Sequence, residues 1–303
     1  MDSHILIQQL ANGLVLGSTY GLIAVGYTMV YGIIGMINFA HGDIYMVSAY
    51  LTALVLALLG ASVSPLVALI LAFVLVVGLT AVFGFSIERI AYKPLRKSPR
   101  LAPLISAIGV SLILQNYVQI TQGARNQAVP TLIPGGLEWN VGGGVVGITW
   151  VQVMIIVVSQ LAMGALTWMI SRTALGRACR ATEQDPKMAA ILGINTDRII
   201  ATVFTLGAAM AAVAGVLVTL NYGSFDFSIG FVTGIKAFTA AVLGGIGSLP
   251  GAMIGGLLLG LSESLFSGFV NSDYKDVFAF SLLVLVLIFK PSGLLGRPQV
   301  EKV

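Results

Sequence analysis

Two glycine-rich segments with polar side chains interrupt the apolar runs of this sequence, and they are its best candidates for binding a solute. They span residues 35–43 and 243–251, and their loose likeness makes them candidates for paired elements of an internal repeat. A helix broken inside a membrane can offer free amides to a carboxylate and free carbonyls to an ammonium, which suits a zwitterion. The alternative is that both segments are plain turns at the membrane surface. The residues that we assign to a candidate translocation pathway are Asn38, His41, Gly42, Gly244, Gly245 and Gly247.

Ionisable side chains are rare in the apolar stretches, so each of them needs an explanation. His41 and Asp43 could titrate or pair with each other, although we expect Asp43 to cap a helix. Lys236 and Glu263 lie near the ends of their stretches, where long side chains can reach the membrane surface, and we expect them to do so. If either one faces the interior of the helix bundle instead, it becomes a candidate functional residue.

A short helix is predicted in a polar stretch between two apolar ones. Asp185 and Pro186 are a typical N-cap and first helical residue, and Gly193 can end the helix in the left-handed conformation. A helix of about seven residues is not stable alone in water, where about 12–15 residues are marginal. Either the chain's own helix ends or a groove on a cytoplasmic subunit must therefore cover its apolar face. The residues of that face are Met188, Ile191 and Leu192.

The sequence motifs of common enzymes and metal sites are missing from the chain. There is no Walker A motif for ATP, no His-Glu-x-x-His zinc motif and no Gly-x-Ser-x-Gly nucleophile motif. Two histidines and one cysteine cannot build a histidine-based metal cluster or an intrachain disulfide. We therefore expect that the chain is not an enzyme and that it carries no cofactor.

The composition places these segments in a membrane. Of the 303 residues, 57% are hydrophobic and 9% are charged, whereas a soluble domain has about 25% charged residues. Residues 44–87 contain no Asp, Glu, Lys or Arg, which leaves room for two helices of the roughly 20 residues that cross a bilayer. Continuous apolar runs indicate helices rather than barrel strands. Glycines four residues apart, such as Gly13, Gly17 and Gly21, predict close helix packing.

The sequence thus predicts an all-α polytopic membrane protein with eight or nine transmembrane helices, some of them broken or re-entrant. We expect a single transmembrane domain that covers residues 1–303 and no cleaved signal peptide, because no lysine or arginine precedes the first apolar stretch. Transport is the default function for a polytopic chain without enzyme motifs.

Lysine and arginine cluster in three regions, which the positive-inside rule places in the cytoplasm. These are the loops at residues 88–100 and 172–198 and the C-terminal tail at 291–303. The loop at 122–148 is then extracytoplasmic, and its prolines and glycines predict an ordered loop. Three apolar stretches precede residue 88, which puts the N-terminus outside, or inside if one of them is re-entrant. Because topology explains the basic residues, the net charge of +4 does not indicate nucleic acid binding.

Several long runs of the sequence carry a family resemblance. The longest are GYTMVYGIIGMINFAHG at residues 26–42 and KAFTAAVLGGIGS at residues 236–248. Shorter runs are GRACRA at 176–181, LGINTDR at 192–198 and LGRP at 295–298. They closely resemble the LivH-type permease family of high-affinity branched-chain amino acid ABC importers. The resemblance covers nearly the whole chain and is weakest in the loop at 122–148.

That resemblance implies partners and a substrate. Members of the family work in the bacterial inner membrane with a second, related permease, two cytoplasmic ATPases and a periplasmic binding protein. They carry leucine, isoleucine and valine, and ATP binding drives alternating access through coupling helices. Relatives with similar runs carry other amino acids, urea or short amides, and an ion-coupled transporter or a passive channel are the other hypotheses. The coupling residues that the resemblance implies are Glu183, Asp185, Pro186, Lys187, Met188, Ala190, Ile191, Leu192, Gly193 and Ile194.

Overall fold

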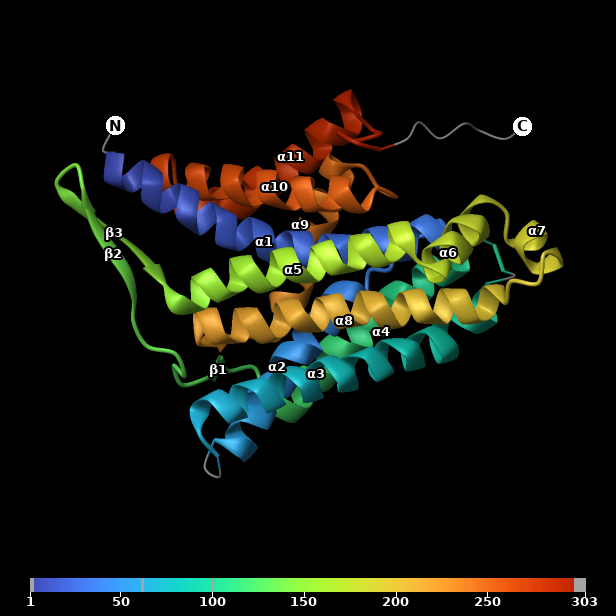
Figure 1. The fold of residues 1–303 in the computed structure, drawn as a ribbon, viewed down its shortest axis with the longest axis horizontal. Coiled ribbons are helices and arrows are strands. Elements are labelled where there is room, and N and C mark those ends of the chain that lie inside the picture. Colours follow the sequence, from blue (N-terminus) through green and yellow to red (C-terminus); the bar gives the residue numbers. More distant parts are fainter. Residues whose placement is uncertain (1–2, 61–62, 97, 100, 297–303) are drawn as a thin grey trace.

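Long apolar helices that run side by side make up most of the chain (Figure 1). The computed structural model describes residues 3–60, 63–96, 98–99 and 101–296. Within these residues, seven helices are long and apolar enough to cross a membrane, as judged by length and composition. They are α1 (Ser3–Ile34), α2 (His41–Leu59), α3 (Pro65–Ile87), α4 (Leu101–Gln122), α5 (Trp150–Arg172), α8 (Thr196–Tyr222) and α10 (Leu249–Phe269).

Shorter helices complete the bundle and its ends. The apolar helices α9 (Ile229–Gly244) and α11 (Lys275–Phe289) have 16 and 15 residues. Together with the seven longer helices they occupy the nine apolar stretches of the sequence, so the predicted all-α membrane fold is confirmed. The remaining helical elements are η1 (Glu88–Tyr92), η2 (Lys93–Leu95), α6 (Ala174–Gln184), α7 (Pro186–Ile191) and η3 (Ser272–Tyr274).

The predicted loop at 122–148 is ordered, and it contains strands that the sequence analysis did not predict. Strands β2 (Gly136–Val141) and β3 (Gly144–Thr149) form an antiparallel hairpin. Gly142 and Gly143 turn it with φ of 58° and 87°, which is the region that a two-residue hairpin turn needs and glycine adopts without strain. A second short pair joins β1 (Gln127–Ala128) to β4 (Ser224–Phe225), so this loop is held to the end of α8.

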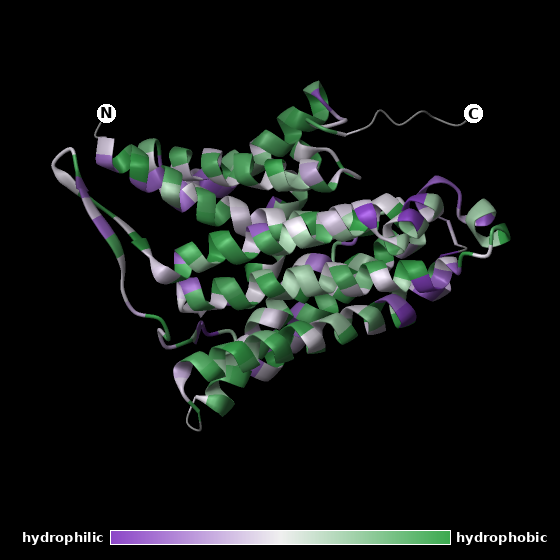
Figure 2. Cartoon of the chain, in the orientation of Figure 1, coloured by the Kyte–Doolittle hydropathy of each residue, from purple (hydrophilic) through white to green (hydrophobic). Residues whose placement is uncertain are grey.

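The two ends of the bundle differ in character. The N-terminal end of α1 lies beside the hairpin, where the Gln8 amide donates to the Gly147 carbonyl at 3.0 Å and accepts from its amide at 2.9 Å. Helices α6 and α7 lie at the opposite end (Figure 1). Figure 2 shows hydrophobic residues along the helices and hydrophilic ones gathered toward the α7 end. Three helices thus precede residue 88, and the start of α1 shares its end of the bundle with the loop predicted to be extracytoplasmic.

Part of the predicted basic regions lies outside the described residues. This applies to Lys97, Arg100 and residues 297–303 of the predicted C-terminal tail. The described basic residues of the first two regions lie at the α7 end, where Lys93 and Arg96 both pair with Asp197 of α8. Arg96 also pairs with Glu88, so the end of α3 is tied to the start of α8.

Helix α1 forms the centre of the bundle and packs closely on α10. Glycines face one another across this contact, as their spacing predicted. A Cβ atom on Gly260 would lie 2.1 Å from the backbone nitrogen of Gly17, and one on Gly17 would lie 2.7 Å from the Cα of Leu257. The backbones therefore touch, which is how membrane helices gain contact energy in the absence of a hydrophobic driving force. The outer helices α3, α4 and α5 instead expose much of their apolar surface.

Both glycine-rich segments break the helical path at the α7 end. Gly35, with φ of 70°, ends α1 before α2 begins at His41. Gly245 and Gly247, with φ of 107° and 94°, separate α9 from α10. The two breaks approach each other, since a Cβ atom on Gly32 would lie 3.9 Å from the Cα of Gly247. Their origin in an internal repeat stays a prediction.

We expect the substitution Gly260→Ala to push α1 and α10 apart, because its methyl group would meet the backbone of Gly17. Overpacking of this kind costs about 1–3 kcal/mol. The melting temperature of the detergent-purified protein should fall, and its aggregated fraction in size-exclusion chromatography should rise. Gly164→Ala in α5 is the matched control, because a Cβ atom there meets nothing within 4 Å. Equal melting temperatures for the two variants would contradict the proposed packing role.

Candidate functional site

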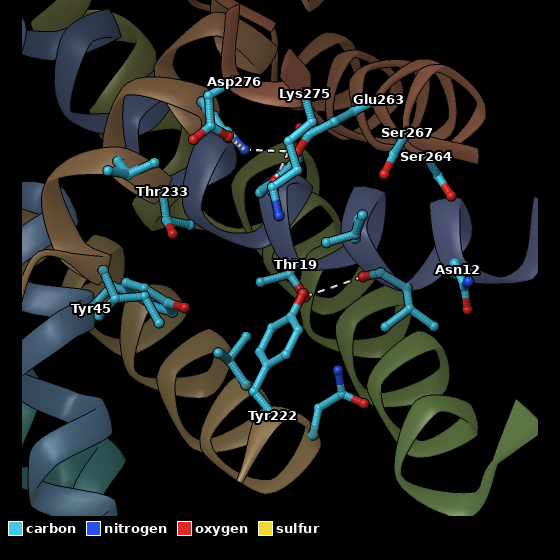
Figure 3. A pocket seen from close by; sticks show the side chains of 18 of the residues that line it. Asn12, Thr19, Tyr45, Tyr222, Thr233, Glu263, Ser264, Ser267, Lys275 and Asp276 are labelled. Atoms are coloured by element: carbon cyan, nitrogen blue, oxygen red, sulfur yellow. Dashed lines mark hydrogen bonds and ion pairs between the residues drawn. The ribbon is translucent and has the colours of Figure 1, made fainter. Parts of the chain in front are cut away.

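A polar cavity of about 600 Å³ is lined mainly by α1, α8, α9, α10 and the start of α11, with one residue each from α2 and α5 (Figure 3). Its outer lining comes from the ends of these helices that lie near the hairpin, so the cavity belongs to the predicted extracytoplasmic half. This outer lining includes Gln9 and Asn12 of α1, Gln152 of α5, Asn221 of α8 and Ser267 of α10.

The inner wall of the cavity carries a buried ionic cluster. The Lys236 Nζ atom lies 2.7 Å from Glu263 Oε1 and 2.5 Å from Asp276 Oδ1. The Tyr20 hydroxyl donates a hydrogen bond of 3.1 Å to Glu263 Oε2. Lys236 and Glu263 are 4% and 2% exposed, whereas the Asp276 side chain is 44% exposed. The cluster thus reaches from the bundle interior to the cavity rim.

The expectation that Lys236 and Glu263 extend to the membrane surface is wrong. Lys236 lies in the middle of α9, on the side that meets α1 and α10, so its nearest charged groups are carboxylates of the same chain. Position near the end of an apolar stretch does not show which face of the helix a residue occupies. Both are therefore ionisable residues that face the interior of the helix bundle, which makes them candidate functional residues.

A buried ion pair such as Lys236–Glu263 is a weak source of folding stability. Burying two charges costs several kcal/mol per ion, and apolar residues of similar volume often stabilise a fold as well or better. The cluster also contains two carboxylates for one ammonium group. Lys275 lines the same cavity (Figure 3), so its wall carries two cationic and two anionic side chains beside a space that a small solute can enter.

The rest of the wall combines hydroxyl groups with aliphatic side chains. Figure 3 shows Thr19, Tyr45, Tyr222 and Thr233 around the space next to the ionic cluster. The Thr19 hydroxyl donates to the Val15 carbonyl at 3.1 Å, which leaves its oxygen able to accept. The aliphatic part of the wall consists of Val15, Leu16, Val218, Ile229 and Val232.

The three pathway candidates of the first break lie in a different place. Asn38 is 4% exposed, and its Oδ1 atom accepts from the Tyr92 hydroxyl at 2.6 Å and from the Ala40 amide at 3.1 Å. His41 is 2% exposed, and its ring meets that of Tyr27 edge-on at 4.7 Å. Asn38 therefore stabilises the bend before α2, and neither residue lines the polar cavity.

Gly42 and Asp43 begin α2 inside the bundle. A Cβ atom on Gly42 would lie 2.3 Å from the Gly230 carbonyl oxygen, so glycine allows α2 to touch α9. The expectation that Asp43 caps α2 is wrong, because the N-cap is Ala40 and no side chain caps the helix. Asp43 is instead fully buried in the first turn, where the helix dipole favours a negative charge.

The candidates of the second break are held by the C-terminal segment. The amides of Leu294 and Leu295 donate to the carbonyls of Leu243 and Gly244, each at 2.9 Å. A Cβ atom on Gly245 would lie 2.2 Å from the backbone nitrogen of Gly296. Each of these two carbonyls therefore already accepts a hydrogen bond from the chain itself.

Gly247, in contrast, has open space around its Cα. None of the six pathway candidates lines the polar cavity. Their role in translocation stays a prediction.

Helix α7 has the local structure that the sequence predicts. The Asp185 side chain accepts from the amides of Lys187 and Met188 at 2.8 and 3.1 Å. Pro186 is the first helical residue, and Gly193 follows the helix with φ of 85°. The Asn195 side chain then caps α8 by accepting from the Arg198 amide at 3.0 Å.

The apolar face of α7 is open in this chain. Ala189 is 2% exposed and packs inward, whereas Met188 is 57% and both Ile191 and Leu192 are 78% exposed. The chain's own helix ends therefore do not cover this face. Lys187 and Ala190 are also exposed, and the Ile194 amide bonds back to the Ala189 carbonyl at 3.0 Å. Glu183 lies nearby on α6, close to Gly32 of α1. The coupling role of these residues stays a prediction.

A double substitution tests whether Lys236 and Glu263 stabilise each other. Lys236→Met leaves the Glu263 carboxylate buried with only the Tyr20 hydroxyl, and breaking a buried pair in this way costs about 3–5 kcal/mol. The double variant Lys236→Met/Glu263→Gln removes both charges, so it should recover most of the lost stability. Thermal unfolding of the purified variants measures both effects. A double variant as unstable as the single one would show that the two residues are not coupled.

The reactivity of Cys179 tests whether this residue of α6 is buried. Burial raises the pKa of the Cys179 thiol above its ordinary value, and the residue is 5% exposed. Since the thiolate is the reactive form, N-ethylmaleimide at pH 7 should modify Cys179 on the order of tenfold more slowly than an exposed thiol. The comparison is Cys179→Ser/Ala190→Cys, which moves the thiol to an exposed position of α7. Equal labelling rates would contradict the buried placement.

Comparisons with known proteins agree with the resemblance in the sequence. Residues 9–287 match the family described as branched-chain amino acid transport system / permease component. The chain is 56% identical over 302 residues to the high-affinity branched-chain amino acid transport system permease protein BraD of Pseudomonas aeruginosa, and this covers 98% of each chain. It is 55% identical over 303 residues to the permease protein LivH of Escherichia coli, which covers 98% of this chain and 97% of that one.

A more distant relative belongs to the same named system. The permease protein LivM of Escherichia coli is 28% identical over 315 residues, which covers 93% of this chain and 69% of LivM. No solved structure matches the chain significantly. Because the family match and the two most similar of these relatives extend over nearly the whole sequence, this chain belongs to the permease family of branched-chain amino acid transport systems.

Proposed function

We propose that this chain is the membrane-spanning permease subunit of an ABC importer that carries leucine, isoleucine and valine into a bacterial cell. The names of relatives that are 55–56% identical support the substrate class. The observation that supports the ATP-driven mechanism is the open apolar face of α7. This face lies at the end of the bundle that carries the basic residues and is therefore assigned to the cytoplasm.

The exposure of α7 is a reason to expect a partner protein. Large apolar side chains in water lose the free energy that burial provides, about 25 cal/mol per Å² of apolar area. Ile191 is the last residue of the six-residue helix α7 and Leu192 is its C-cap, and α6 and α8 contact this helix. A preformed amphipathic helix of this kind suits a groove on a separate subunit. We assign that groove to a cytoplasmic ATPase.

Movement of α7 has a direct route into the membrane. Only a short turn separates it from α8, whose first turn is capped by Asn195. Asp197 in that first turn pairs with Lys93 and Arg96, so α3 is attached to α8 at the same level. Helix α8 packs in turn against α1, α2 and α3. An ATPase that shifts α7 would thus shift the inner ends of α8 and α3 together.

The complete importer needs further subunits. We propose a second, related permease, two ATPases and a periplasmic binding protein, with the whole assembly in the bacterial inner membrane. The distant match to LivM, a permease protein of the same named system, supports the second permease. The hairpin lies at the end of the bundle where a binding protein would arrive. The chain itself would carry out no chemical reaction, since ATP hydrolysis belongs to the ATPases.

Two other functions make distinct predictions. A permease for another amino acid, urea or a short amide would keep ATP dependence but change the substrate profile. An ion-coupled transporter is favoured by the buried acids Asp43 and Glu263, although Lys236 neutralises the second one. Leucine uptake that survives ATP depletion but stops with an uncoupler would favour ion coupling over the ABC mechanism.

We expect Leu192→Asp and Gly193→Pro to abolish ATP-dependent leucine uptake without preventing membrane insertion. The first places a charge on the docking face, and losing one buried hot-spot contact costs about 2 kcal/mol or more, roughly thirtyfold in affinity. The second is incompatible with φ of 85°, because proline fixes φ near −65°. Uptake into vesicles that contain the complete importer, together with co-purification of the ATPases, measures the effect.

Ser98→Asp is the control for these variants. It adds the same charge to an exposed position of the other predicted cytoplasmic loop, outside α7. Uptake should remain near the wild-type level in this variant. Normal ATP-dependent uptake in both α7 variants would remove the coupling role.

A further inference from the structure

We infer that the Lys236–Glu263–Asp276 cluster is a binding subsite for the α-ammonium and α-carboxylate groups of the transported amino acid. The inference rests on the proposed function, and it assigns substrate contacts to residues outside both glycine-rich segments. The substrate would occupy the polar cavity before it crosses the bundle.

The hydrogen-bonding capacity of the cluster suits a zwitterion. Lys236 has three N–H donors; it donates a hydrogen bond to Glu263 and forms an ion pair with Asp276. A remaining donor can bind one oxygen of a carboxylate. The oxygens of Glu263 and Asp276 can accept from an ammonium group. A substrate with both groups therefore finds both complements within one cluster.

The rest of the cavity suits an aliphatic amino acid. Its volume of about 600 Å³ lies within the 300–1,000 Å³ that is typical of small-molecule sites. Val15, Leu16, Val218 and Val232 supply aliphatic surface beside the ionic cluster. The wall thus offers both charged groups and aliphatic surface, which are the two kinds of group that leucine, isoleucine and valine carry.

The position of the cluster supports binding over a purely structural role. A structural ion pair can be buried in packed protein on every side, whereas this one borders a cavity. Asp276 is partly exposed, and Lys236 and Glu263 are buried directly behind it. A solute that enters from the hairpin end would meet Asp276 first and the buried pair next. Ionisable residues that face a cavity within a membrane protein mark solute pathways.

Leucine binding to the complete importer, purified in detergent without its binding protein, tests the inference. Titration of ³H-leucine by scintillation proximity gives the dissociation constant. We expect wild-type binding to be displaced by valine, but not by 4-methylpentanoate, which lacks the ammonium, or by isoamylamine, which lacks the carboxylate. The variant Lys236→Met/Glu263→Gln should weaken binding at least tenfold, because it removes both complements.

Control variants separate the subsite from folding. Lys290→Met/Glu138→Gln removes the same two charges from exposed positions outside the cavity and should bind leucine like the wild type. If the cluster variant does not fold, Asp276→Asn takes its place, because that side chain is 44% exposed. It should weaken leucine binding several-fold and leave the melting temperature unchanged.

Two results would overturn the subsite. One is the absence of saturable leucine binding to the wild type. The other is wild-type affinity in a folded cluster variant, or in Asp276→Asn where the cluster variant does not fold. Uptake of leucine by the wild-type importer, with ATP and the binding protein present, is measured in parallel. If that uptake fails, the proposed function fails, whereas normal uptake together with either negative binding result removes the subsite alone.

Discussion

Water is absent from the core of a bilayer, so every polar group that this chain places there needs a partner within the protein. The requirement makes the apolar stretches helical and explains the bonds at each interruption. At the second break, the amides of Leu294 and Leu295 bond to the carbonyls that end α9. At the first, Asn38 joins Tyr92 and the Ala40 amide. The same requirement gives Lys236 two carboxylate partners.

The opposite requirement applies at the α7 end, which we propose to lie in the cytoplasm: there water is present, and exposed apolar surface needs a cover. Within the described residues, α3, α4 and α5 also expose apolar side chains, but these helices are long enough to lie in lipid. Helix α7 has no such explanation, because it follows a polar helix and lies beyond the ends of the spans. Its exposed leucine and isoleucine therefore indicate a protein partner rather than lipid.

Local features could be predicted from the sequence, and features that depend on helix faces could not. The Asp185 cap, the left-handed Gly193 and the nine apolar helices follow from neighbouring residues, and the structure has them. The hairpin could have been predicted, because Leu137, Trp139 and Val141 alternate with polar residues and the Gly142-Gly143 pair that follows is typical of a two-residue turn. Lys236 was assigned to the surface because the apolar pattern gives depth along α9 but not the side that it turns to α1 and α10. The lining of the cavity comes from seven helices, so no single segment could predict it.

The geometry of α9 and α10 connects the buried pair to the rest of the bundle. Near the α7 end the two helices touch through glycine, since a Cβ atom on Gly255 would lie 2.1 Å from the Ala240 carbonyl oxygen. Farther along, Lys236 of α9 pairs with Glu263 of α10, and both residues line the cavity. Helix α10 is held to α1 by glycine contacts, whereas α9 is attached to α11 through Asp276. The Lys236–Glu263 pair thus joins α9 to α10 at the wall of the cavity, so a relative movement of the two helices and occupancy of the cavity would affect the same bond.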